Sequence, residues 1–363
     1  MNLSVSVHDP ADGRWTAANV SSDCFCAARD NGSTHHHHQP TDPIFTPVLY
    51  LTVTVSALGF LTNLLLLVLF LNFPSLRRGV GVFIVHLLAT QTLFCGAVMP
   101  GTFHMIFRAQ AGRPVACSTC LYHHTFHSLV WNAAIWTDAI LAVNRIVAVC
   151  LPARFHFLSL TSVRILIASL GLIPVLVSTV PPLFWNSGVV YQMTPVGLCV
   201  LRLQTELVRW LNLLTARSPL VLLAFAVVVV ATNTLFVKMQ MRRVDGRSTI
   251  TNPDPGHGVV VASTVQRSVN PARTSPLMKR RQKMSWILAA GFLFTLLCQS
   301  PQWLIASWFN AVWTLNPVMP LVWRFCTVLQ FAVVPVIFYW MSSDYQTKAG
   351  ELYDRIVMRR VIT

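Results

Sequence analysis

The sequence predicts an all-α polytopic membrane protein, a bundle of seven transmembrane helices followed by a short membrane-lying helix. Three observations support this fold class. Of the 363 residues, 54% are hydrophobic and only 11% are charged, whereas about 25% of a soluble domain is charged. Seven apolar segments each reach the roughly 20 residues that cross a hydrocarbon core about 30 Å thick. Basic residues collect in the connections on one side of these segments, as expected of cytoplasmic loops.

The seven spans of the transmembrane domain, residues 44–341, are placed by their length and their lack of charge. They are 44–71, 80–107, 120–150, 162–185, 205–240, 284–311 and 318–341. The fifth and sixth segments exceed one bilayer, which predicts helices that extend into the cytoplasm. Residues from about 241 to 283 form a long cytoplasmic third loop rich in Gly, Pro, Ser and Thr. Basic clusters flank this loop, so the N-terminus is expected outside the cell and the C-terminus inside.

Residues 1–43 are polar and aperiodic, which predicts a disordered extracellular tail. The tail has no apolar signal-peptide region, so the first span is expected to act as the signal anchor. A run from His35 to His38 is interpreted as a low-complexity tract, because no framework of metal ligands surrounds it. No metal or cofactor is predicted. Three N-x-S sequons lie on the expected outer side and are predicted glycosylation sites: Asn2, Asn19 and Asn31.

Residues 342–363 predict an amphipathic helix lying on the inner leaflet, followed by a short cytoplasmic tail, with Tyr345 turned to the lipid. The net charge of +15 follows from this membrane topology. Any attraction of the basic clusters to anionic membrane lipids is a by-product of this topology, and the charge gives no reason to expect nucleic-acid binding.

Several landmarks recur at fixed offsets along the spans. Cys120 opens the third span and Arg145 lies 25 residues later, so about 37 Å of helix separates them. Pro152 follows the arginine by seven residues. Prolines that bend helices by removing a backbone hydrogen bond, together with other matching positions, complete the set: Asn63, Pro219, Pro301, Pro335 and Tyr345. Over roughly residues 45–346 the chain resembles the rhodopsin-like (class A) G-protein-coupled receptors, as a divergent member.

This resemblance implies a plasma-membrane receptor that binds an extracellular ligand and couples to a heterotrimeric G protein near Arg145. The bends at Pro301 and Pro335 would take part in the switch. A disulfide between Cys120 and Cys199 would pin the second extracellular loop over the bundle, with Cys117 as a competing partner. The pairing of Cys24 and Cys26 stays open.

The chain departs from the family at its switch positions. Asn144 replaces the acid before Arg145, and Gln91 replaces the sodium-site acid, so no sodium modulation is expected. Gln299 replaces the toggle tryptophan of the sixth span. Asp138 is the one acid deep within a span, which makes it a functional candidate. It would pair with Arg145, contact Gln91 or be protonated, and its role is either a structural contact or part of the switch.

The outer half of the bundle is expected to hold the ligand pocket. His127 occupies the position of the family's amine-binding aspartate, so an amine ligand is not expected. Arg324, with Arg202 and Arg209, would form a positive mouth for an acidic small molecule or peptide, unless Arg324 snorkels to the interface. The predicted ligand-binding set is His104, His127, Trp131, Asn132, Gln302, Trp303 and Arg324.

Two other functional classes remain as alternatives to a signalling receptor. One is a receptor-like seven-helix protein without G-protein signalling, acting as a scaffold or ligand sink. The other is a transporter, which would favour paired intramembrane charges and repeated halves. The chain has no catalytic cluster or cofactor motif, so an enzyme is not predicted.

Overall fold

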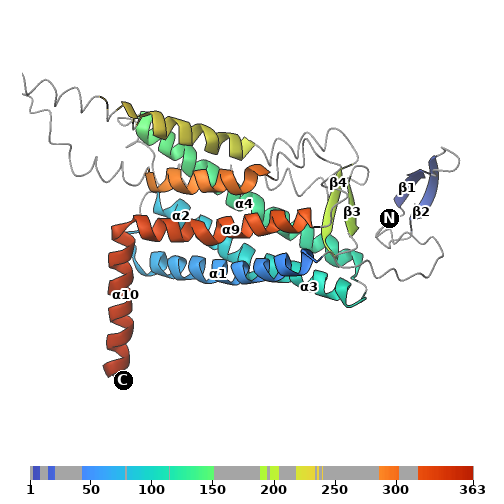
Figure 1. The fold of residues 1–363 in the computed structure, drawn as a ribbon, viewed down its shortest axis with the longest axis horizontal. Coiled ribbons are helices and arrows are strands. Elements are labelled where there is room, and N and C mark those ends of the chain that lie inside the picture. Colours follow the sequence, from blue (N-terminus) through green and yellow to red (C-terminus); the bar gives the residue numbers. More distant parts are fainter. Residues whose placement is uncertain are drawn as a thin grey trace, which may run out of the picture.

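The computed structural model describes residues 3–8, 15–20, 43–77, 80–113, 115–150, 189–193, 197–203, 218–233, 235, 236, 239, 286–301 and 318–362. Within these residues, the long helices run side by side along the long axis of the molecule (Figure 1). The predicted fourth span, 162–185, lies outside the described residues, as do most of the tail and the long third loop.

The helices follow the predicted spans closely. The first span is α1 (Phe45–Asn72) and the third is α4 (Cys117–Cys150), which begins three residues before the predicted segment. The seventh span is α9 (Met319–Met341), and α10 (Ser343–Ile362) follows it. The fifth and sixth spans contribute the helical stretches Ser218–Asn233 and Trp286–Pro301. At the C-terminal end α10 turns away across the end of the bundle (Figure 1).

The second span is one helical path with a π-turn in its middle: α2 (Gly81–Leu93), η1 (Phe94–Val98) and α3 (Met99–Gln110). The amide of Met99 donates to the carbonyl of Phe94, the five-residue spacing of a π-turn. Pro100 follows immediately. It cannot donate to Gly96, and its ring disfavours a regular helix there. The turn adds one residue to the helix and so rotates the inward face by about 100°.

Three helical segments among the described residues are long and apolar enough to cross a membrane: α1, the α2–η1–α3 path and α9. Their outward faces carry large exposed apolar side chains, such as Leu58 and Leu65 of α1. A soluble protein rarely exposes such a continuous apolar surface, whereas a bilayer covers it.

The two larger apolar clusters of the described residues lie one toward each end of the bundle. The cluster nearer α10 includes Phe70, Phe83 and Phe338. The other, nearer the opposite end, includes Phe94 and Phe331, whose rings meet edge to face with centroids 4.9 Å apart. In the first cluster α1 packs with α2 and α9, and in the second it packs with η1, α3 and α9, so the first and last spans are held together.

The prediction that Tyr345 faces the lipid is wrong. Its side chain is buried and its ring packs edge to face on Phe70, with centroids 5.1 Å apart. The ring gains more from an aromatic partner at the end of α1 than from the interface, because aromatic pairs contribute about 0.5–1.5 kcal/mol beyond burial. Tyr345 therefore fastens the start of α10 to the bundle.

Two antiparallel hairpins accompany the helices. The prediction of disorder is corrected for part of the tail, because β1 (Leu3–His8) pairs with β2 (Trp15–Val20) in the register Leu3 with Val20. The sequence of β1 alternates apolar and polar residues, the period of a strand. The backbone of the predicted glycosylation site Asn19 lies in β2, while Asn2 and Asn31 lie outside the described residues.

The second hairpin joins β3 (Val189–Met193) to β4 (Cys199–Leu203) at the end of the bundle opposite α10 (Figure 1). Gly197, between the strands, has a φ of 85° and lies directly against α3. A side chain there would come within 2.6 Å of Ala109. Only glycine fits both this conformation and this close approach.

A hydrogen bond between α1 and α9 compensates for a proline. Pro335 has no amide hydrogen to donate to the carbonyl of Phe331, four residues earlier. The buried side chain of Asn63 supplies the missing donor. Its Nδ2 donates to the Phe331 carbonyl at 2.8 Å and to the Gly59 carbonyl of its own helix at 2.7 Å. Asn63 and Pro335 are therefore one structural unit.

Replacing Asn63 by leucine is expected to lower stability by about 1–3 kcal/mol, because it leaves a buried carbonyl unpaired. Thermal unfolding of the purified protein in detergent measures the effect. Asn72→Leu is the matched control, since the exposed Asn72 donates only within its own helix. In a Pro335→Ala background, where an amide can return, the Asn63→Leu loss should shrink. An equal loss in both backgrounds would contradict the compensation.

Candidate functional site

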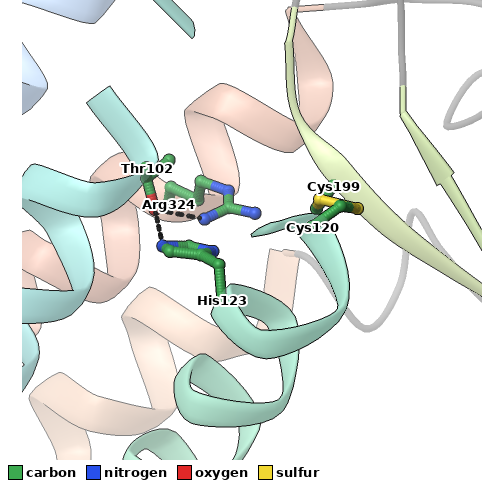
Figure 2. Close-up of a disulfide and its surroundings, with 5 residues drawn as sticks. All are labelled: Thr102, Cys120, His123, Cys199 and Arg324. Atoms are coloured by element: carbon green, nitrogen blue, oxygen red, sulfur yellow. Dashed lines mark hydrogen bonds between the residues drawn. A yellow bond between two sulfur atoms is a disulfide. The ribbon is translucent and has the colours of Figure 1, made fainter. Parts of the chain in front are cut away.

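Arg324 lies buried in the end of the bundle that faces the β3–β4 hairpin. Its side chain is only 5% exposed. Its Nη1 donates to the hydroxyl of Thr102 on α3 at 3.0 Å, while its Nε is buried without a hydrogen-bond partner among the described residues. The side chain of Arg324 is therefore directed into the bundle and does not snorkel to the interface. Figure 2 shows the guanidinium between Thr102 and the N-terminal end of α4.

No carboxylate of the described residues pairs with Arg324, and the one ion pair among them is Lys348 with Glu351 on α10. A buried cation without a counter-charge costs several kcal/mol, because its lost hydration is not replaced. A group that brings a negative charge to this place would recover much of that cost.

His123 completes the polar contacts around Thr102. Its Nε2 lies 3.0 Å from the carbonyl of Val98 and 3.3 Å from the Thr102 hydroxyl. Because a carbonyl only accepts, the proton is assigned to Nε2. The Nδ1 atom is then a buried acceptor, and it has no partner among the described residues. Gly101 makes the approach possible, since a Cβ there would lie 2.9 Å from the imidazole.

Aromatic rings form the floor of this cluster, next to Arg324. Trp323 meets His127 with centroids 6.0 Å apart and Trp131 with centroids 6.4 Å apart. The ring of His127 also packs on that of Phe94, with centroids 5.3 Å apart. The indole Nε1 of Trp131 is buried and has no hydrogen-bond partner among the described residues. We refer to Thr102, His123, His127, Trp131, Trp323 and Arg324 as the outer cluster.

The outer cluster combines donors with unused capacity and flat apolar surfaces. Arg324 Nε and Trp131 Nε1 are donors, and His123 Nδ1 is an acceptor. Buried polar groups normally find partners. The arrangement is thus suited to a ligand that carries an anionic acceptor and an apolar or aromatic body.

A disulfide between Cys120 and Cys199 joins α4 to β4 beside this cluster (Figure 2). Both cysteines are buried. This is the pair that the family resemblance implied. The bond holds the β3–β4 hairpin at the end of the bundle, one helical turn from His123.

The predicted pocket residues separate into three groups. The structure brings His127 and Trp131 of α4 close to Arg324 of α9. Asn132 is also buried, on α4. Gln302 and Trp303 lie outside the described residues, as does Arg209; of Arg202 only the backbone, in β4, is described.

His104 is exposed and does not join the outer cluster, contrary to the prediction. The π-turn explains the error. An uninterrupted helix would have a different inward face, whereas the extra residue directs Thr102 inward and His104 outward. Thr102, His123 and Trp323 were missed by sequence reasoning. Two features of the sequence point to them: Trp323 is adjacent to Arg324, and His123 lies one helical turn before His127.

The core below the outer cluster holds a second polar contact. Gln299, at the position of the family's toggle tryptophan, donates through Nε2 to Oε1 of Gln330 on α9 at 2.7 Å. Both side chains are fully buried. The link joins the sixth and seventh spans, two residues from Pro301. Pro301 is exposed and Pro335 is buried within α9.

Asp138 is buried in the middle of α4, and its Oδ2 has no hydrogen-bond partner among the described residues. The predicted contact with Gln91 is absent, because neither amide atom of Gln91 has a partner. Gln91 lies on the other side of the π-turn from Thr102, in the α2 part of the path. Arg145 lies two turns beyond Asp138 in α4, next to the half-buried Asn144; the side chain of Arg145 is not among those described.

Residues 62–341 match the family described as 7 transmembrane receptor (rhodopsin family). The chain is 26% identical over 191 residues to the zebrafish (Danio rerio) trace amine-associated receptor 13c, a match covering 53% of this chain and 50% of that protein. The aligned part spans about half the length of that relative.

A crystal structure of squid rhodopsin superposes on the protein with a TM-score of 0.64, at 13% identity and with 86% of each chain covered. At this identity the likeness shows the fold, a seven-helix bundle. The fold and the family match agree on one class, the multi-pass seven-transmembrane receptors. The chain belongs to the rhodopsin family of these seven-transmembrane receptors, and it is not an enzyme.

Proposed function

We propose that this receptor binds an extracellular ligand through a carboxylate or similar anionic group held by Arg324. In this proposal the N-terminus and the outer cluster face outward from the plasma membrane. The observation that carries the proposal is the buried guanidinium, which has no carboxylate partner among the described residues and whose Nε makes no hydrogen bond with them. A bidentate carboxylate matches the geometry of arginine better than any neutral group.

An acidic ligand fits the outer cluster better than an amine does. The name of the zebrafish relative refers to trace amines, and a protonated amine requires a carboxylate partner in a buried site. Here the family's amine-binding position is His127, and the charged group described nearby is a cation. The like charges of an amine and Arg324 would repel each other.

The remaining predicted pocket residues define the body of the proposed ligand. His127 and Trp131 offer ring faces and Asn132 a polar contact, and we propose that Gln302 and Trp303 contribute from the sixth span. Ring-lined sites favour aromatic or apolar groups. Acidic peptides and aromatic carboxylic acids are therefore the ligand classes to test first.

We further propose that a heterotrimeric G protein binds at the opposite end of the bundle, near Arg145 and Asn144. The bends at Pro301 and Pro335 are proposed to allow the inner half of the sixth span to move. With Asn144 in place of an acid, Arg145 lacks the usual restraint. The Gln299–Gln330 contact is a candidate for the link that must rearrange, because it joins the sixth and seventh spans.

Coupling is tested by expressing the full chain with a panel of Gα subunits and measuring basal and peptide-evoked signalling. We expect at least one Gα subunit to give a signal above that of cells lacking the receptor, and Arg145→Ala to remove it at equal surface expression. Silence with every subunit and every ligand class, at normal surface expression, would instead favour a receptor-like scaffold or ligand sink.

Asp138 is proposed as a part of the switch. Replacing it with asparagine removes the ionisable group that, in this proposal, restrains Arg145, so basal signalling is expected to rise several-fold. The measurement is basal second-messenger level, normalised to surface receptor. Unchanged basal and evoked activity would limit Asp138 to a packing role.

A further inference from the structure

An apolar groove of about 400 Å³ lies on the outer surface where α1, α9 and α10 meet. Its walls include Leu65 and Leu69 of α1, Val336 and Trp340 of α9, and Leu352 of α10. Leu65 is 69% exposed and Trp340 is 74% exposed. The groove therefore opens outward, to the bilayer, and is separate from the outer cluster at the other end of the bundle.

One end of the groove is marked by cations. Phe73, one helical turn beyond Leu69, has Lys348 Nζ 5.2 Å and Arg355 Cζ 5.1 Å from its ring centroid. Leu352 lies between these two residues on the same face of α10, since it follows Lys348 by four positions and precedes Arg355 by three. The two cations thus flank the end of the groove that lies at the membrane surface.

The two cations differ in their free charge. Lys348 is engaged by Glu351, with Nζ 2.6 Å from Oε1. Arg355 is exposed and has no carboxylate partner among the described residues. Its guanidinium is held over Phe73 with donors to spare, and arginine binds phosphate through two parallel hydrogen bonds. Arg355 is therefore the group available to an anion at this end.

The groove runs along α1 from Leu69 toward Thr62, a length of about 10 Å at 1.5 Å per residue. It begins at the charged interface and leads into the hydrocarbon region, past Pro335. A phospholipid has this same order of parts: an anionic headgroup at the surface and an acyl chain directed inward. A sterol would fill the apolar part but has no negative charge for Arg355.

We infer that the groove binds one anionic phospholipid, with an acyl chain between α1 and α9 and the phosphate on Arg355. The inference rests on the orientation proposed above, in which α10 lies at the inner leaflet, where anionic lipids are concentrated. A bound lipid contacts three helices at once and so stabilises the corner formed by α1, α9 and α10.

Photolabelling in nanodiscs tests the inference. The full chain is reconstituted in phosphatidylcholine with a trace of phosphatidylserine that carries a photoreactive group in its acyl chain. Peptides containing residues 62–69 and 349–353 should be labelled. Unlabelled phosphatidylserine should compete at least five-fold better than phosphatidylcholine.

Variants separate the headgroup site from the groove. Arg355→Gln should abolish the difference between the two phospholipids. Leu65→Trp should fill the groove and reduce labelling several-fold. Leu58→Trp is the control, since Leu58 also faces the lipid but lies outside the groove, and it should leave labelling unchanged.

Three results would overturn the inference. Equal competition by the two phospholipids would indicate only ordinary contact with the bilayer. Competition by cholesterol but not by phosphatidylserine would indicate a sterol site. Labelling that is unaffected by Leu65→Trp would place the lipid elsewhere. Protection of the α10 end from added protease in sealed cells tests the orientation separately, so failure of the two proposals can be told apart.

Discussion

Arg324→Met is expected to stabilise the unliganded receptor and, at the same time, to remove its response to carboxylate ligands. Arg324 is 5% exposed, makes one described hydrogen bond and has no described counter-charge. Replacing buried charges with apolar side chains of similar volume is often neutral or stabilising, by about 1–4 kcal/mol. A ligand that brings a carboxylate to Arg324 would offset this cost.

Thermal unfolding in detergent checks the stability half of this prediction. Arg113→Met is the matched control, because Arg113 is an exposed arginine at the same end of the bundle. Thr102→Val should act in the opposite direction. It removes the acceptor of the Arg324 Nη1 hydrogen bond and should cost about 1–3 kcal/mol. In the Arg324→Met background the Thr102→Val loss should be smaller, since the two residues are coupled. A melting temperature for Arg324→Met well below that of the wild type would contradict the interpretation.

Removing the Cys120–Cys199 disulfide is the second change with a large expected effect. The bond closes a loop of 79 residues, which corresponds to roughly 4–5 kcal/mol in the chain-entropy treatment. It also holds the β3–β4 hairpin beside the outer cluster. The double variant Cys120→Ser/Cys199→Ser should therefore lose most of its surface expression and, where it reaches the surface, its ligand response.

Antibody labelling of intact cells measures this loss. Each single variant should lose as much as the double variant, because either one breaks the bond. Cys326→Ser is the control, since Cys326 is a free, half-buried cysteine of α9. Wild-type surface levels and ligand response in the double variant would show that the hairpin is held by other contacts.

The sequence predicts the spans well because hydropathy and length suffice for them. The ends of α1 and α9 differ from the predicted segments by one residue at most. Arg324, His127 and Trp131 stand out in the sequence because a charge or a polar ring in an apolar helix is conspicuous. The π-turn at Phe94–Val98 is not predicted by the hydropathy of the segment, although Pro100 explains it. Because of this turn, Thr102 faces the inside of the bundle and His104 faces outward.

Other parts of the site depend on contacts between distant segments, which one sequence does not reveal. Tyr345 was expected at the lipid because the helix it begins is amphipathic, yet Phe70 lies in reach and buries it. Trp323 on α9 is positioned by packing against the ring of His127 on α4. Asn63 was recognised as a landmark, but its function as the donor for the carbonyl that Pro335 leaves free depends on the packing of α1 on α9.

We propose that Arg324 receives the negative charge of the ligand, and pairs of acids and their amides test this contact directly. G-protein activation is measured with carboxylic acids, acidic peptides and the corresponding neutral amides on the wild type and on Arg324→Met. We expect an active acid whose amide is about 100-fold weaker, a factor worth roughly 3 kcal/mol, and a variant on which the two are equally weak. Equal potency of acid and amide on the wild type, or an undiminished acid response in Arg324→Met, would contradict it.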